Sequence, residues 1–168
     1  LFESRNQARR WKRIRTFPEV AALRLENSQA DRQLWIAGTE GQGVWISRDN
    51  ARNWHPTAPE LADANVYGVA VDPHDGSRMA AGGWGTGVLV SADQGHSWQR
   101  AAGPEASPNI TVMVYDENVP GRLWVSTFEE GTFFSDDHGR TWTNANLDGA
   151  YVYDLDFLPP GTEQRASR

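Results

Sequence analysis

The stretch Ser135-Asp136-Asp137-His138-Gly139-Arg140-Thr141-Trp142 decides the fold of this chain, because its pattern Ser-x-Asp-x-Gly-x-x-Trp recurs upstream. A second full copy runs from Ser91 to Trp98. Two less regular copies, which lack the glycine, run from Ser47 to Trp54 and from Ser4 to Trp11. The four serines are 43, 44 and 44 residues apart. An interval of this size predicts a repeat architecture, and about four strands of ordinary length fit into it.

Each position of the pattern has a physical reason. Asp93 and Asp137 can accept hydrogen bonds from backbone N–H groups a few residues ahead, and Gly95 and Gly139 adopt a positive φ at little cost. The tryptophan begins the return strand, where its ring can cover the end of the hairpin. A catalytic pair has no reason to recur once per repeat. We therefore predict a structural role for Ser47, Asp49, Trp54, Ser91, Asp93, Gly95, Trp98, Ser135, Asp137, Gly139 and Trp142.

These copies resemble the Asp-box, or BNR, repeat of β-propellers. Gly43, Gly87 and Gly131, each four residues before its serine, strengthen the resemblance. Proteins that share this repeat include sialidases, xyloglucan-active glycoside hydrolases, sortilin-like receptors and photosystem II assembly factors, so the repeat indicates a fold better than a function. The resemblance implies a secreted or extracytoplasmic location.

We therefore expect an all-β fold made of four-stranded antiparallel β-propeller blades, each about 44 residues long. Short apolar runs bounded by glycine, such as Val44 to Ser47 and Val88 to Ser91, predict the strands, and no segment favours a helix. The chain holds about 3.8 repeats, which predicts an incomplete arc of a larger propeller. The expected parts are the end of a blade at residues 1–15, blades at 16–58, 59–102 and 103–146, the first strand of a further blade at 147–158, and a polar tail at 159–168.

The composition is that of a folded domain, with 39% hydrophobic and 23% charged residues among 168. There is no cysteine and no histidine pair with ligand spacing, so we predict no metal site and no cofactor. No apolar run is long enough to predict a membrane span. The chain begins at Leu1 without methionine, which predicts a processed product or an excised fragment.

Residues 1–15 are strongly basic in a chain whose formal net charge is −6. A basic stripe can bind nucleic acid, but no stacking aromatic side chains or recognition motif accompany it here. We interpret it as an outer edge strand whose charges deter pairing with other strands, and we predict no nucleic-acid partner.

In a propeller, the loops between strands two and three share one end of the molecule with the crossovers between blades. Those loops carry aromatic side chains beside carboxylates and amides, a mixture that suits sugars but is also ordinary for a protein surface. The candidate ligand-binding residues are Glu40, Gln42, Trp84, Thr86, Phe128, Glu129 and Glu130. The crossovers contribute further polar residues and Tyr151 to the same end.

Two functions stay open. The first is a non-catalytic platform for binding or assembly, which the strict period and short loops favour. The second is part of a xyloglucanase-like or sialidase-like glycoside hydrolase that binds a glycan at this end. No catalytic residue can be assigned, because the arginine triad and tyrosine nucleophile of sialidases match no motif of this chain. The expected partner is a protein or a glycan, and self-association or more of the same chain can complete the ring.

Overall fold

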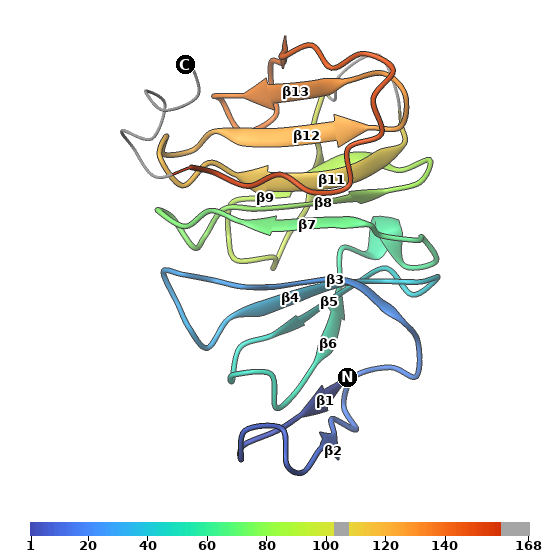
Figure 1. The fold of residues 1–168 in the computed structure, drawn as a ribbon, viewed down its shortest axis with the longest axis vertical. Helices are drawn as coiled ribbons and strands as arrows, with labels where there is room; N and C mark the ends of the chain where they lie inside the picture. Colours follow the sequence, from blue (N-terminus) through green and yellow to red (C-terminus); the bar gives the residue numbers. More distant parts are fainter. Residues whose placement is uncertain (103–107, 159–168) are drawn as a thin grey trace, which may run out of the picture.

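The computed structural model describes residues 1–102 and 108–158, which form three four-stranded antiparallel sheets and one two-stranded sheet (Figure 1). The all-β prediction is confirmed. The two-stranded sheet pairs β1 (Phe2–Glu3) with β2 (Lys12–Arg13). The first full blade is β3 (Ala22–Asn27), β4 (Trp35–Thr39), β5 (Val44–Ser47) and β6 (His55–Thr57); the second is β7 (Gly68–Val71), β8 (Met79–Gly83), β9 (Gly87–Ser91) and β10 (Gln99–Arg100); the third is β11 (Ile110–Tyr115), β12 (Leu123–Thr127), β13 (Thr132–Ser135) and β14 (Thr143–Asn144).

The repeated turn closes on itself through its serine and aspartate. Asp137 Oδ1 accepts hydrogen bonds from the backbone N–H groups of Arg140 and Thr141 at 3.0 and 2.8 Å, and Gly139 N donates to Ser135 Oγ at 2.8 Å. Gly139 has a φ of 81°, a value that favours glycine. The Thr141 hydroxyl donates to Asp137 Oδ2 at 2.7 Å, and this bond, with the backbone N–H of the same residue, lowers the pKa of the Asp137 carboxyl to about 2. The turn therefore closes the hairpin between strands three and four of the third blade.

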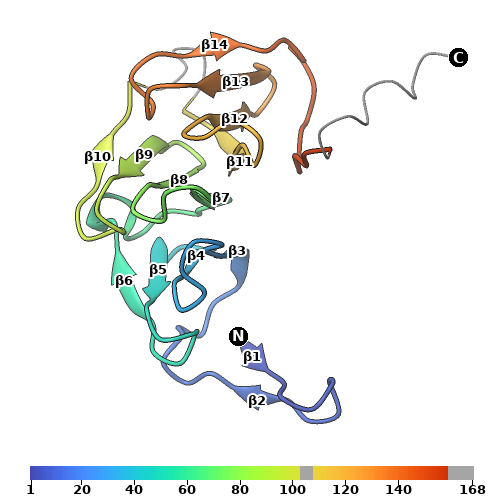
Figure 2. The same ribbon diagram turned by 90° about the vertical axis from the view of Figure 1, so that its left-hand side faces the viewer.

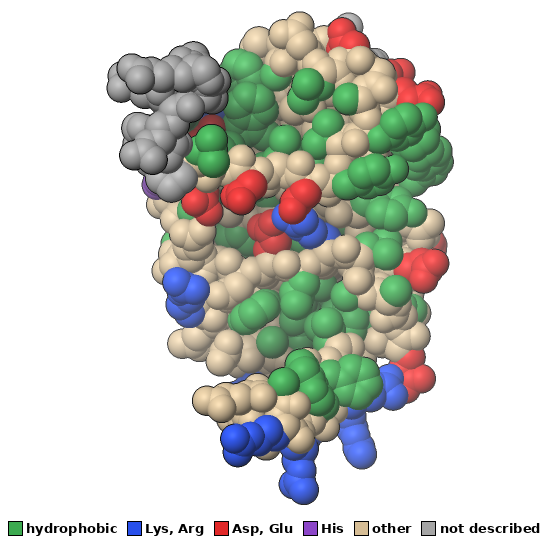
Figure 3. Space-filling view, in the orientation of Figure 1, with side chains coloured by type: hydrophobic (Ala, Val, Ile, Leu, Met, Phe, Trp, Pro, Cys, Tyr) green, Lys and Arg blue, Asp and Glu red, His purple; other side chains and the backbone are tan. Residues whose placement is uncertain are grey.

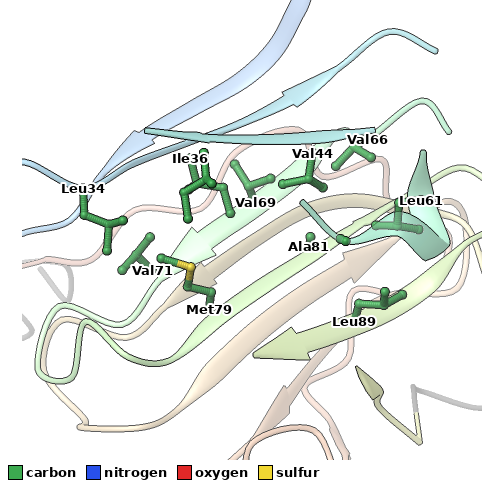
Figure 4. Packing of buried hydrophobic residues seen from close by; sticks show 12 residues of the cluster. Leu34, Ile36, Val44, Leu61, Val66, Val69, Val71, Met79, Ala81 and Leu89 are labelled. Carbon is green, nitrogen blue, oxygen red and sulfur yellow. The ribbon is translucent and has the colours of Figure 1, made fainter. Parts of the chain in front are cut away.

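Most of the core lies between blades. One cluster joins the first and second blades and includes Ile36, Ile46, Val69 and Met79, all at most 2% exposed (Figure 4). A second cluster joins the second and third blades, and a smaller one packs Phe17 and Trp54 between the N-terminal segment and the first blade. Side chains on the two faces of a strand thus serve two different interfaces.

The blades form an open arc (Figure 2). The first strands, β3, β7 and β11, lie on the concave side, and the fourth strands, β6, β10 and β14, lie on the convex side. In Figure 1 the loops between strands two and three lie at the right-hand end, and the Asp-containing turns lie at the left. An arc of this kind fits an incomplete propeller.

The structure differs from the sequence analysis in two places. We expected residues 147–158 to include a strand from Tyr151 to Phe157, but the described chain has no strand there. A strand needs a partner, and the second strand with which this segment would pair is not among the described residues. The segment still follows the concave side, where Thr111 Oγ1 donates to Val152 O at 2.8 Å. One short 3-10 turn, η1 (Pro59–Leu61), also forms in a crossover where we expected no helix. The predicted tail at 159–168 lies outside the described residues.

Candidate functional site

Three aromatic side chains meet at the end of the molecule that carries the loops between strands two and three. The rings of Trp84 and Phe128 have centroids 5.0 Å apart, and those of Phe128 and Tyr151 are 4.7 Å apart. Trp84 and Tyr151 are 52% and 48% exposed, so about half of each outer side chain faces solvent. We call these three residues the aromatic row. In the space-filling view, hydrophobic side chains gather at this right-hand end (Figure 3).

Backbone contacts between neighbouring blades position the aromatic row. Trp84 N donates to Asn65 O at 3.2 Å, and Phe128 N donates to Asn109 O at 2.9 Å, so each loop is tied to the crossover that precedes its blade. Gly83 has to be glycine because a Cβ atom there would collide with the carbonyl of Asn65. The row is therefore held by the repeat scaffold itself.

Glu129 links the loop of Phe128 to the crossover that carries Tyr151. The Tyr151 hydroxyl donates to Glu129 Oε1 at 2.6 Å, and Gly149 N donates to Glu129 O at 2.8 Å. The hydrogen bond to Glu129 raises the pKa of the Tyr151 hydroxyl. Glu129 adopts a φ of 73°, an uncommon value for a residue other than glycine, asparagine or aspartate, so the loop conformation is locally constrained. The carboxylate is thereby fixed beside the aromatic row.

The other predicted site residues are distributed unevenly. Glu40 and Glu130 are exposed in the loops of the first and third blades. Gln42 lies in a separate hollow that it shares with Trp45 and Pro59. Its backbone carbonyl accepts a hydrogen bond from Trp45 Nε1. Thr86 is buried, and its hydroxyl bonds to Gly83 and Gly87 inside the loop, so it offers nothing to a ligand at the surface. Of the predicted ligand-binding residues, the structure thus brings together Trp84, Phe128 and Glu129, and Tyr151 lies beside them.

The concave side carries a cluster of charged side chains that the sequence analysis missed. Arg24 contacts Glu26 Oε1 at 3.4 Å and Asp154 Oδ1 at 3.2 Å, in a hollow of about 380 Å³ beside the first strands. Burial raises the pKa of the Glu26 carboxyl to about 7, although Arg24 acts in the opposite direction. Glu26 looks like an ordinary strand residue in the sequence, so no sequence signal could have found it.

The described residues offer neither a metal site nor a membrane-spanning helix. No group of three or more His, Asp or Glu side chains there is placed to hold a metal ion. None of the helical segments described is long and apolar enough to cross a membrane.

No family model and no curated protein matches the chain. Solved structures do resemble it. An ancestral GH74 enzyme superposes with a TM-score of 0.71 at 18% identity, covering 88% of this chain and 21% of that one. YCF48 from Cyanidioschyzon merolae superposes with a TM-score of 0.68 at 18% identity, covering 83% and 41%. The WD40 repeats of RRP9 superpose with a TM-score of 0.59 at 12% identity, covering 82% and 42%.

At these identities the likeness shows the fold alone. The chain folds as an open arc of β-propeller blades, and it spans between about a fifth and two fifths of the length of these neighbours. Because they include both glycoside hydrolases and propellers of other kinds, the fold does not choose between catalysis and binding. The assignment of the turns to the Asp-box family stays a prediction.

Proposed function

We propose that the protein is a non-catalytic binding platform, and that it binds a protein partner through the aromatic row. The observation that carries this proposal is the row itself, in which two half-exposed rings flank Phe128 across two blades and the following crossover. Aromatic side chains that are held rigidly and left accessible supply large contact area at a low cost in conformational entropy. One solved neighbour, a YCF48 protein, is described as bound to D1 peptide, which supports peptide binding as a use of this fold.

The geometry of the row favours a protein partner over a sugar. The ring planes are inclined by 69° between Trp84 and Phe128 and by 72° between Phe128 and Tyr151. Such rings form an edge-to-face row and share no flat surface on which successive sugar rings could stack. Side chains of a peptide can instead contact the two outer rings separately.

The test is to pan a library of unstructured peptides on the protein and to probe an oligosaccharide array in parallel. We expect peptides to be selected, and we expect Trp84→Ala and Tyr151→Ala each to weaken them by about 1–2 kcal/mol through lost ring contact. Trp11→Ala is the matched control, because Trp11 is 60% exposed but belongs to the N-terminal segment. Peptides that bind all three variants equally, or binding confined to the oligosaccharides, would refute the proposal.

A second candidate is glycoside hydrolysis on the concave side. Glu26 favours it, because retaining and inverting glycosidases pair a carboxyl that stays protonated near neutral pH with an ionised one. Asp154 lies in the same hollow and supplies a second carboxylate. The test measures reducing ends released from xyloglucan, the polymer named for one solved neighbour, a GH74 xyloglucanase from Xanthomonas campestris. Release that is lost in Glu26→Gln would establish this candidate, and no release by the unaltered protein would dismiss it.

A further inference from the structure

The loop end that carries the aromatic row is rich in carboxylates. Its described loops and crossovers at residues 39–43, 58–67, 83–87, 108–109, 127–131 and 145–151 contain no lysine, arginine or histidine. Two basic side chains do reach this end: Arg15 lies in the crossover between β2 and β3, and the Arg100 guanidinium donates to Thr86 O. The same segments carry six exposed carboxylates, at Glu40, Glu60, Asp63, Glu129, Glu130 and Asp148. The opposite end mixes both signs, since its turns include Arg32, Arg48, Arg52, Arg78, Arg122 and Arg140. The acidity is therefore a property of one end and does not follow from the net charge of the chain.

Three of these carboxylates, at Glu129, Glu130 and Asp148, lie in the loop and crossover that carry Phe128 and Tyr151. Glu129 is hydrogen-bonded to Tyr151, Glu130 follows it, and the Asp148 carboxylate lies close to Gly131 at the start of β13. The electron-rich faces of Trp and Tyr attract cations, and neighbouring carboxylates strengthen the attraction. A lysine or arginine side chain can place its methylene groups on a ring and its charge among the carboxylates. Phosphate groups and acidic lipid surfaces are repelled by the same arrangement.

We propose that the partner contributes an extended segment rich in lysine and arginine, which binds across the aromatic row. This inference rests on the proposed binding function and names the chemistry of its ligand. Cation–π contact with Trp84 and Tyr151 supplies part of the affinity, and Glu129, Glu130 and Asp148 select positive charge and speed the encounter. The affinity therefore falls as salt rises, because exposed ion pairs are screened over about 8 Å at physiological ionic strength.

The experiment compares three synthetic twelve-residue peptides, which share a glycine and serine backbone and carry four Lys/Arg, four Gln or four Glu residues. Binding of each fluorescent peptide to the 168-residue chain is followed by anisotropy at low and at raised salt. We expect the cationic peptide alone to bind, about tenfold more weakly at raised salt. Trp84→Ala should weaken it about fivefold, the equivalent of about 1 kcal/mol.

Two double variants that each remove two negative charges measure how much the carboxylates beside the aromatic row contribute to binding. Glu130→Gln with Asp148→Asn should weaken the cationic peptide several-fold, whereas Asp31→Asn with Glu117→Gln, which removes two carboxylates from the opposite end, should leave its affinity unchanged. Melting curves check that each variant folds. Equal loss in both pairs, or equal binding of the three peptides, would overturn the inference. If the Gln peptide binds and its binding depends on Trp84, the proposed binding function is supported and the proposed cationic ligand is wrong. If none of the three peptides binds and the peptide library yields no binder, the proposed binding function and the proposed ligand are both wrong.

Discussion

Trp98 donates its indole N–H to Thr57 Oγ1 at 2.9 Å across the interface between the first and second blades. The corresponding pair one repeat later is Trp142 and Ala101, and Ala101 has no hydroxyl to offer. Trp142 Nε1 is buried and has no hydrogen-bond partner among the described residues. A buried donor without a partner costs free energy, so the second interblade interface is weaker at this point than the first.

This difference predicts that Ala101→Thr stabilises the protein. The new hydroxyl would lie where Thr57 lies in the preceding interface and would accept the indole N–H of Trp142, which is worth about 1 kcal/mol in the free energy of unfolding. Thr57→Ala should have the opposite effect. Denaturant unfolding measures both changes, and Ala101→Val is the control, since it adds similar bulk without an acceptor. Equal gains from threonine and valine would mean that the bulk, and not the hydrogen bond, is responsible.

The repeated turn predicts sensitivity to acid. Asp49 Oδ1 accepts hydrogen bonds from the backbone N–H groups of Asn53 and Arg52, and these bonds, the one from Asn53 above all, lower the pKa of the Asp49 carboxyl to about 2. Because the folded-state pKa is lower than the unfolded one, the stabilisation is present above about pH 4 and is lost as the pH falls towards 2. Asp49→Ala should cost about 1 kcal/mol at neutral pH, as the loss of a carboxylate cap does.

Thermal melts between pH 2 and pH 7 measure this dependence, with the exposed loop residue Asp63 changed to alanine as a control. The difference between Asp49→Ala and the unaltered protein should shrink towards pH 2, where the carboxyl is protonated in the unfolded state and about half protonated in the folded state. A difference that stays constant over this range would show that the turn is stabilised by something other than the charge.

The raised pKa of the Glu26 carboxyl predicts that stability depends on pH with the opposite sign. Burial raises the pKa of its carboxyl to about 7, so between about pH 4.5 and 7 the folded state binds a proton that the unfolded state has lost. Stability therefore falls as the pH rises through this range, by at most about 3.5 kcal/mol, since one pKa unit is worth about 1.4 kcal/mol. The side chain is 21% exposed, which favours a smaller value. Glu26→Gln should remove this slope and stabilise the protein above pH 7, as denaturant unfolding at several pH values would show.

Much of the scaffold follows from the sequence, because the repeat supplies its own alignment. Trp84 and Phe128 are 44 residues apart, so the repeat places them at equivalent loop positions in adjacent blades, and there the structure brings their rings into contact. Thr86 belongs to the same pattern, but the short loop folds its hydroxyl back onto Gly83 and Gly87, a detail that depends on local geometry.

The parts that sequence analysis missed depend on contacts outside one repeat. Tyr151 follows the last full blade, and it reaches Phe128 only because the crossover after β14 returns over the loop of Glu129. The burial of Glu26 likewise depends on neighbouring strands and on the segment that carries Asp154. Neither arrangement has a spacing that a sequence could reveal.

The last prediction concerns the open side of the third blade. Leu123 and Val125 point into the interface with the second blade, so Trp124, between them on β12, points the other way. It pairs with Phe134, and their ring centroids are 5.0 Å apart. The equivalent positions of the first blade, Ile36 and Ile46, are at most 2% exposed under the next blade. In the third blade both aromatic residues remain partly exposed, as on a face that another blade would cover.

We therefore expect the isolated 168-residue chain to associate through this face or to remain a crescent in solution. Size-exclusion chromatography with small-angle scattering distinguishes these states from a closed disc. If the chain associates, Trp124→Gln should shift it towards the monomer, because it removes apolar area from the open face and none from the interfaces between blades. Trp11→Gln, which alters an exposed tryptophan of the N-terminal segment, separates an effect of this face from a general loss of apolar surface. A compact monomer with the scattering profile of a closed ring would contradict the prediction, since closing the ring would leave backbone groups unpaired beside β1, whose second edge has no partner strand in the described chain.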